Sequence, residues 1–229
     1  MRSFNEKRRN FILTVWLLLS ILPRLISAQE KHPFVIQGKI DFVSQNVWRG
    51  CYQAGVSQQP EAVVSFRNWQ FSVWGTTDFR GEGKEIDLTV RYEWKNISVG
   101  LTDYRFGSVD APYVSGHIPE ANIEYCFPDL PLSLSFNTVI AGDDGCHSGY
   151  VEFLYTPEWH NWQFDFSAGV SPWKNTLLET DKFAVTKLSA SIAKTVAKSD
   201  SFSVGIFTSI VYNPSKDNAF FIAGISVPF

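Results

Sequence analysis

Apolar and polar residues alternate with a period of two in segment after segment of this chain. The clearest example runs from Glu85 to Trp94, where charged or hydroxyl side chains alternate with Ile86, Leu88, Val90, Tyr92 and Trp94. Successive side chains of a β-strand point to opposite faces, so this pattern predicts a strand with one polar and one apolar face. A strand of a soluble sheet can show the same pattern, and the number of such segments therefore carries the argument.

Twelve segments with this period follow one another, and most have a length close to the roughly 9 to 11 residues that a tilted strand needs to cross a bilayer. Their large apolar residues share one face and their small polar residues share the other, whereas the outer face of a soluble sandwich tends to carry Lys and Glu. We therefore predict an all-β fold, an antiparallel transmembrane β-barrel of twelve strands. Ten strands are the alternative, because the second and eighth segments are the least regular. The segments are residues 34–48, 60–67, 69–79, 85–94, 97–105, 118–127, 130–140, 149–157, 161–171, 183–196, 201–212 and 218–229.

The links between these segments alternate in length. Outer-membrane barrels combine short periplasmic turns with longer outer loops, and an even number of strands places both ends of the barrel on the periplasmic side. Short links are expected at residues 68, 95–96, 128–129, 158–160 and 197–200, and mostly longer ones at 49–59, 80–84, 106–117, 141–148, 172–182 and 213–217. Aromatic residues near the strand ends suit the two interfacial girdles of such a barrel. These are Trp48, Trp69, Trp94, Trp159, Trp162, Trp173 and Tyr212.

The first 28 residues have the pattern of a secretory signal peptide. Basic residues precede an apolar run from Phe11 to Leu22, and the small residues Ser27 and Ala28 provide a cleavage point. The run is shorter than the roughly 20 residues of a membrane-spanning helix, so cleavage is favoured over anchoring. We expect a signal peptide at residues 1–28 and the barrel at residues 29–229, in a bacterial outer membrane.

Charge and composition exclude several other classes. The leader holds 5 of the 20 basic and 1 of the 23 acidic residues, which leaves 15 basic and 22 acidic residues and a net charge of −7. This balance argues against a nucleic-acid partner. With 8 Trp, 8 Tyr and 19 Phe, the chain is too aromatic to be disordered.

The segment at 218–229 resembles a targeting signal. Phe221, Ile225 and Phe229 share its apolar face, and a terminal aromatic residue on an alternating strand resembles the signal that hands outer-membrane barrels to their assembly machinery. Expected partners are therefore outer-membrane lipid, the barrel-assembly machinery through Phe229, and small solutes or ions.

The stretch FVSQNVWRG, residues 42–50, resembles the opening of the TorF-type porin family. Members of this family are small Gram-negative outer-membrane proteins in which the first strand ends in Ser-x-x-x-x-Arg-Gly, followed by a Gln-containing loop and a Pro. Gln53, Gln58, Gln59 and Pro60 fit that continuation, and residues 84–88 resemble an acidic strand start of the same family. Cys51 departs from the small or apolar residue expected there. The resemblance covers about a quarter of the barrel and implies a porin-like role.

Placing the polar face inside gives an acidic lumen, with 10 acidic and 5 basic residues. A water-filled lumen of this composition would favour cations or small neutral solutes. The alternative is mutual ion pairing, with Asp41 near Arg49 and with Glu85 and Asp87 near Arg67 and Arg91, which would fill the interior. The expected pore-lining residues are Asp41, Arg49, Glu61, Arg67, Glu85, Asp87, Arg91, Glu93, Glu120, Glu124 and Asp165.

Arg49 has two interpretations. It could line a constriction opposite Glu61 or Asp87, or it could tie the first loop to the barrel wall through ion pairs. Cys51 and Cys146 both fall in outer loops and could form a disulfide, since the expected compartment is oxidising.

No catalytic residues, cofactor or metal site are expected. His147 lies among Asp143, Asp144, Cys146 and Ser148, a cluster more typical of a solvated loop than of a catalytic or metal site. The sequence predicts a porin-like channel for passive diffusion, with a mild cation preference. A non-conducting structural or surface-interaction barrel with an ion-paired lumen is the main alternative, and an outer-leaflet lipid-modifying enzyme is a third.

Overall fold

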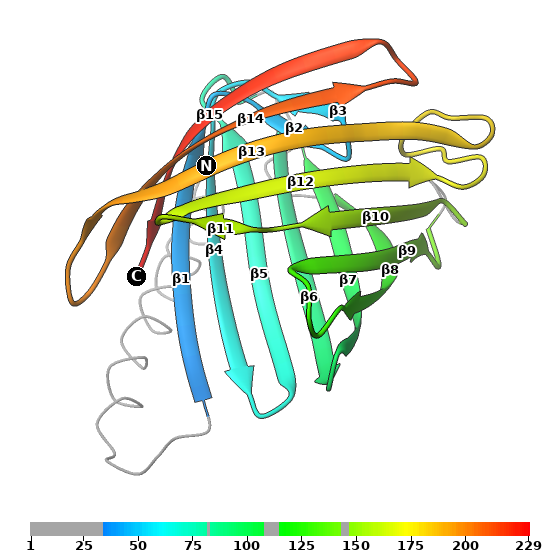
Figure 1. Cartoon of the computed structure of the whole chain (residues 1–229). Helices are drawn as coiled ribbons and strands as arrows, with labels where there is room; N and C mark the ends of the chain where they lie inside the picture. The colour runs from blue at the N-terminus through cyan, green and yellow to red at the C-terminus, as the bar shows by residue number, and fades with distance from the viewer. Residues whose placement is uncertain (1–33, 82, 108–114, 143–146) are drawn as a thin grey trace, which may run out of the picture. The chain divides into compact units, whose positions relative to one another are not determined.

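Antiparallel strands make up most of residues 34–229 (Figure 1). The computed structural model describes this range except for residues 82, 108–114 and 143–146. The expected signal peptide and its cleavage point lie outside the described residues.

Twelve strands form one closed sheet. β1 pairs with β15 on one side and with β4 on the other, and β10 pairs with both β9 and β12. Each wall strand therefore has a hydrogen-bonded neighbour on both sides, and the sheet closes into a barrel. The predicted twelve-stranded antiparallel barrel is confirmed, and the ten-stranded alternative is wrong. The barrel strands are β1 (Phe34–Val43), β4 (Ser57–Phe66), β5 (Trp69–Asp78), β6 (Lys84–Trp94), β7 (Ile97–Gly107), β8 (Ser115–Cys126), β9 (Leu132–Val139), β10 (Gly149–Tyr155), β12 (Trp162–Ser171), β13 (Ala184–Lys198), β14 (Ser203–Asn213) and β15 (Asn218–Pro228).

Three short strands complete the fold. β11 (Glu158–Trp159) pairs with the start of β12 in the link after β10. β2 (Asn46–Trp48) and β3 (Cys51–Ala54) pair only with each other, as a small separate hairpin. The first predicted segment, 34–48, is thus wrong beyond Val43, because the chain leaves the wall there and turns into this hairpin. Ser44 and Gln45 bind backbone carbonyls of Ala223 and Phe221 at the point of departure.

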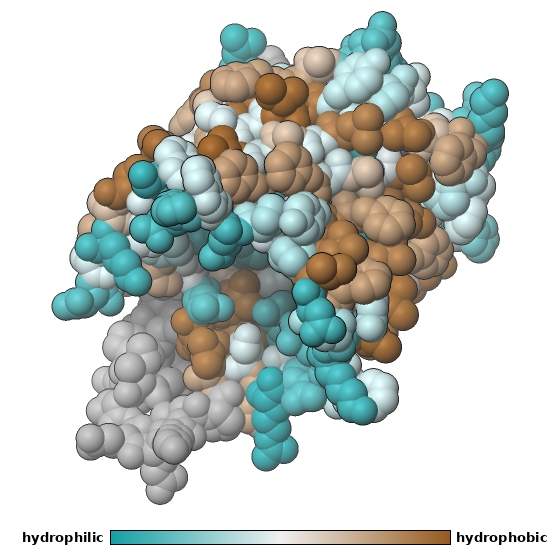
Figure 2. Space-filling model, in the orientation of Figure 1, coloured by the Kyte–Doolittle hydropathy of each residue, from teal (hydrophilic) through white to brown (hydrophobic). Residues whose placement is uncertain are grey.

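The outward face of the wall is apolar, as a surface in contact with lipid tails requires. Exposed large side chains recur at every second position, for example at Trp69, Phe71 and Val73 of β5 and at Val99 and Leu101 of β7. Figure 2 shows apolar side chains gathered along the flank of the molecule and hydrophilic ones toward its ends. Within the described residues, no helix is long and apolar enough to cross a membrane.

The first and last barrel strands meet in a seam beside Phe229, where the blue and red strands run together in Figure 1. Gly38 and Phe229 exchange both backbone hydrogen bonds, at 3.0 and 2.8 Å. The Phe229 ring lies against Gly38 so closely that a Cβ at residue 38 would come within 2.5 Å of it. Glycine at this position therefore leaves the space that the ring occupies.

Candidate functional site

The β2–β3 hairpin lies inside the barrel and contacts its wall at several distant strands. Arg49 and Gly50 form its tip, both with positive φ, at 50° and 83°. Gly50 packs directly on β13, where a Cβ would lie 1.9 Å from the carbonyl oxygen of Thr186, and its own carbonyl accepts a hydrogen bond from Asn213 Nδ2 at 3.0 Å. Only glycine fits this backbone conformation and this contact.

Arg49 anchors the hairpin to β8. Its Nη1 and Nη2 donate to the two carboxylate oxygens of Glu120 at 2.7 and 2.8 Å, a bidentate pair. The guanidinium carbon also lies 4.4 Å from the ring centroids of both Trp48 and Tyr150, which is favourable for cation–π attraction. The Arg49 side chain is 10% exposed and that of Glu120 is fully buried. Arg49 thus ties the first loop to the wall through an ion pair with Glu120 on β8.

Glu120 receives two further hydrogen bonds from the wall. Tyr104 Oη and Asn122 Nδ2 each donate to Oε1 at 2.9 Å. Asn122 Nδ2 also donates to Asn137, and Thr102 donates to Asn122, so the anchor belongs to a hydrogen-bonded row across β7, β8 and β9. Buried carboxylates require such compensation, because an uncompensated charge is costly to bury.

A small apolar cluster covers the hairpin toward the outer loops. Cys51, Tyr150 and Leu178 are buried together, with Trp48 against them. Leu178 belongs to the link between β12 and β13, in which Asn175 and Thr180 exchange backbone hydrogen bonds. The expected Cys51–Cys146 disulfide cannot be placed, since Cys146 lies outside the described residues, as do Asp143 and Asp144 of the His147 cluster.

The assignment of Trp48 to an interfacial girdle is wrong. Trp48 lies in the hairpin, with its ring centroid 5.6 Å from that of Tyr104, and not at the lipid interface. Sequence reasoning also missed Tyr104 and Tyr150 as inner residues, because it treated aromatic side chains as outward ones. Their phase was the available signal, because Tyr104 lies two positions from Thr102 and Tyr150 two positions from Glu152, on the same inward face of each strand.

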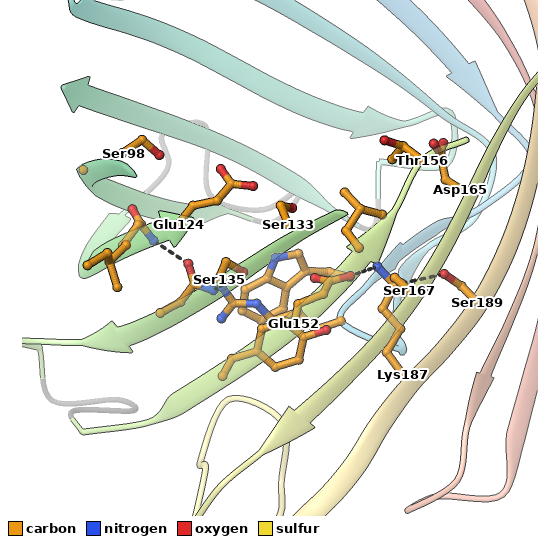
Figure 3. A pocket seen from close by; sticks show the side chains of 18 of the residues that line it. Ser98, Glu124, Ser133, Ser135, Glu152, Thr156, Asp165, Ser167, Lys187 and Ser189 are labelled. Atoms are coloured by element: carbon orange, nitrogen blue, oxygen red, sulfur yellow. Dashed lines mark hydrogen bonds and ion pairs between the residues drawn. The ribbon is translucent and has the colours of Figure 1, made fainter. Parts of the chain in front are cut away.

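A polar cavity of about 670 Å³ lies beside the hairpin, inside the barrel (Figure 3). Two ion pairs cross its wall: Lys187 Nζ to Glu152 at 2.6 Å, and Arg91 Nη1 to Glu124 at 2.8 Å. Serine hydroxyls from several strands line much of the remainder, and three of them take part in serine–serine hydrogen bonds. The Oγ atoms of Ser167 and Ser189 are 2.7 Å apart, and Ser191 of the lining donates to Ser209, which lies outside the lining, at 2.8 Å.

The residues expected to line a pore are distributed over three places. Arg49, Arg91, Glu124 and Asp165 border the cavity. Asp41 and Glu61 both pair with Lys39, at 3.2 and 3.1 Å, and Glu85 and Asp87 lie on β6; these four residues are not part of the cavity lining. Glu93 is exposed near the end of β6, and Arg67 lies in the β4–β5 turn with its guanidinium 5.2 Å from the Phe66 ring.

The ion pairs suggested for a filled lumen differ from those observed. Arg91 binds Glu124 and Arg67 lies over Phe66, so neither neutralises Glu85 or Asp87. Asp41 binds Lys39 and Arg49 binds Glu120. The physical reason is that Lys39 lies opposite Glu61 on the neighbouring strand β4, and that the hairpin crosses the interior and carries Arg49 to Glu120 on β8, a contact that sequence distance does not indicate.

Comparison with known proteins supports the fold. No protein-family model and no curated protein matches the chain. Among solved structures, KdgM porin superposes with a TM-score of 0.51 at 8% identity, covering 84% of this chain and 98% of that porin. A bacterial polysaccharide outer membrane secretin gives 0.40 at 12% identity over 87% and 99% of the two chains, and a Rh. blastica porin mutant gives 0.36 at 12% over 81% and 61%. At 8% identity the likeness to KdgM porin shows the β-barrel fold alone.

Proposed function

We propose that this protein is a porin-like channel of a bacterial outer membrane, through which small solutes diffuse passively with a mild preference for cations. The observation that carries the proposal is the polar cavity inside a closed twelve-stranded barrel with an apolar outer face. A space of about 670 Å³ bordered by hydroxyl, amide and ion-paired side chains suits hydrated small solutes. The fold likeness to KdgM porin points the same way.

The cation preference rests on the carboxylates that face no base. Lys39, Arg49, Arg91 and Lys187 each bind inner carboxylates, but among the described residues Glu85, Asp87 and Asp165 have no ion-pair partner. The inner surface therefore keeps an excess of negative charge. The hairpin tip would form the narrowest part of the path, with Arg49 in place as one side of it.

The setting belongs to the same proposal. Residues 1–28 would direct export as a signal peptide, Phe229 would be read by the barrel-assembly machinery, and outer-membrane lipid would surround the apolar flank. The resemblance of residues 42–50 to TorF-type porins supports this role, and the barrel would act without catalysis or a cofactor.

Single-channel conductance of the refolded chain in planar bilayers, under a potassium chloride gradient, tests the proposal. We expect stable steps and a reversal potential that indicates cation preference. The double variant Glu85→Gln, Asp87→Asn should move the reversal potential toward zero, because it removes two uncompensated inner charges. Glu124→Gln is the matched comparison. It removes a carboxylate that is paired with Arg91, so any shift of its reversal potential comes from the freed charge of Arg91 and not from Glu85 and Asp87.

A non-conducting barrel is the second candidate, and the hairpin favours it. Arg49, Gly50 and the cluster around Leu178 occupy the interior and are well anchored. Absence of conductance from protein whose folding is shown by heat-modifiable gel migration would contradict the channel and support a surface-interaction barrel instead.

A further inference from the structure

The inner surface of β5 and β6 carries a group of buried oxygen atoms near the hairpin anchor. Thr76 and Glu85 are direct cross-strand partners, as are Trp74 and Asp87. Thr76 and Glu85 are each only 8% exposed. Glu85 and Asp87 occupy successive inward positions of β6, between the outward side chains of Ile86 and Leu88. Directly opposed side chains on one face have Cβ atoms about 4.5–5.5 Å apart, so these oxygens face a common space.

No positive side chain of the described residues forms an ion pair with this group, since neither Glu85 nor Asp87 has a Lys, Arg or His partner there. Arg49 is the base anchored nearby, through Tyr104 and Glu120, and both of its terminal nitrogens already bind Glu120. The two carboxyl groups therefore constitute a buried excess of negative charge, which folded proteins neutralise by a proton or a bound cation.

Unpartnered oxygen atoms provide the second, independent observation. Thr76 Oγ1 and Asp87 Oδ1 are both buried and have no hydrogen-bond partner, and the same is true of Asp78 Oδ2, one inward position farther along β5. Thr76 is more than nine-tenths buried and lies at the inward register position directly opposite Glu85. Nearly all buried polar atoms in folded proteins have a partner, so several orphaned acceptors in one place indicate a missing ligand.

We propose that Glu85, Asp87 and Thr76 bind a hydrated hard divalent cation, Mg²⁺ or Ca²⁺. Carboxylate and hydroxyl oxygens are the ligands that these ions prefer, and Mg²⁺ in particular is commonly held by one or two carboxylates while it keeps several water molecules. No three His, Cys, Asp or Glu side chains within the described part of the chain are arranged as a metal cage. The site is therefore a two-carboxylate one completed by water, with a dissociation constant on the order of 10⁻⁴–10⁻³ M, as in weak extracellular calcium sites.

This cation site goes beyond the proposed passage of solutes and does not depend on it. A barrel that conducts nothing could still bind the ion, and a channel could conduct without holding one. A negative result for cation binding therefore does not contradict the proposed channel, and a negative result for conductance does not contradict the cation site.

Terbium luminescence tests the proposal, because Tb³⁺ replaces Ca²⁺ at oxygen sites and Trp74 faces Asp87 as an intrinsic sensitiser. With the chain refolded in detergent micelles, excitation of tryptophan should produce terbium emission that millimolar Ca²⁺ or Mg²⁺ displaces. The double variant Glu85→Gln, Asp87→Asn should lose most of this displaceable emission. Glu61→Gln is the matched control: Glu61 is also a cross-strand partner of Trp74, but it is paired with Lys39, so its removal should leave the emission in place.

Trp74→Phe separates the sensitiser from the ligands. This variant should lose emission but keep the rise in melting temperature that millimolar Ca²⁺ gives the unchanged chain, whereas the double variant should lose both. Emission and calcium stabilisation that survive in the double variant would overturn the proposal, as would their absence from the unchanged, folded chain. In the latter case the two carboxyl groups are neutralised by a proton.

Discussion

Most of the described acidic residues around the cavity are paired with a base, whereas those on the inner face of β5 and β6 are not. At the cavity, Glu124 and Glu152 each bind a base at 2.8 and 2.6 Å, and Glu120 beside it binds Arg49 at 2.7 Å. Among the described cavity acids only Asp165 has no base, and it accepts a hydrogen bond from Gln163. On β6, Glu85 and Asp87 bind none among the described residues. The two regions show that an excess of acids counted from the sequence does not locate the negative charge: the carboxylates that bind a base contribute little to the field, and the unpaired ones contribute most of it.

Removing the base at the most buried pair should have the largest effect. Arg49→Met leaves Glu120 fully buried and negative, and breaking a buried ion pair in this way costs about 3–5 kcal/mol. We expect a loss of that order in the free energy of unfolding, measured by urea titration in lipid vesicles. Conductance should rise as the hairpin detaches from β8.

Arg91→Met is the control for this change. Its pair with Glu124 is 34% and 25% exposed, so water can solvate the remaining carboxylate and the loss should be below about 1 kcal/mol. Equal losses in the two variants would contradict the importance of burial at the hairpin anchor.

Lys187→Met tests the pair next to the cavity at an intermediate level of burial. Glu152 would keep a negative charge without its partner, and a hydrogen bond to a charged group contributes about 1.5–3 kcal/mol. We expect destabilisation within that range and stronger cation selectivity, because the cavity wall would now resemble β6. The second change Glu152→Gln should restore both values toward those of the unchanged chain; persistence of the altered selectivity would argue against Glu152 as its source.

The pair between Glu179 and Lys216, at 2.6 Å in the outer loops, should have the smallest effect because Glu179 is fully solvated. The hydrogen bond and charge of Lys216 lower the pKa of Glu179 below its usual 4.5, and the hydrogen bond that Lys216 Nζ donates to Glu179 raises the pKa of Lys216 above 10.5. A lowered carboxyl pKa stabilises the folded chain above pH 4.5, and this stabilisation is lost as the pH falls through the pKa of the folded state. A raised lysine pKa stabilises it below pH 10.5 and is lost as the pH rises through the folded value.

Melting temperatures of the unchanged chain and of Glu179→Gln should therefore differ slightly between these two pH values and converge outside them. A difference that grows under acidic conditions would show that the pair is not its cause.

The barrel itself follows from the sequence, because inward and outward positions alternate along every strand and the links alternate in length. The inner arrangement does not follow. Residues 46–48 continue the alternation of the first strand, and only the hydrogen bonds of Ser44 and Gln45 to β15 reveal that the chain departs there. Arg49 was identified as a residue of interest, but its partner Glu120 lies on β8, brought within reach by a hairpin whose direction no local pattern encodes.

Tyr104 and Tyr150 illustrate the same limit from another side. Each lies on the same strand face as its polar neighbours, but its large aromatic ring suggests a position on the outer, lipid-facing surface. Their contacts with Glu120 and Arg49 give them inward positions, because a buried guanidinium and carboxylate favour aromatic rings and hydroxyl donors around them.

The seam at Gly38 and Phe229 has a consequence for how the barrel can be assembled. The other neighbouring wall strands follow one another along the chain and can form as hairpins; short strands intervene only between β1 and β4 (β2 and β3) and between β10 and β12 (β11). β1 and β15 can pair only after nearly all of the wall has been made. Until then, both strands present unpaired backbone edges, which promote association with other chains. Pairing of β1 with β15 is thus the step that converts an aggregation-prone open sheet into a closed barrel. The packing of the Phe229 ring on Gly38 is formed in this step.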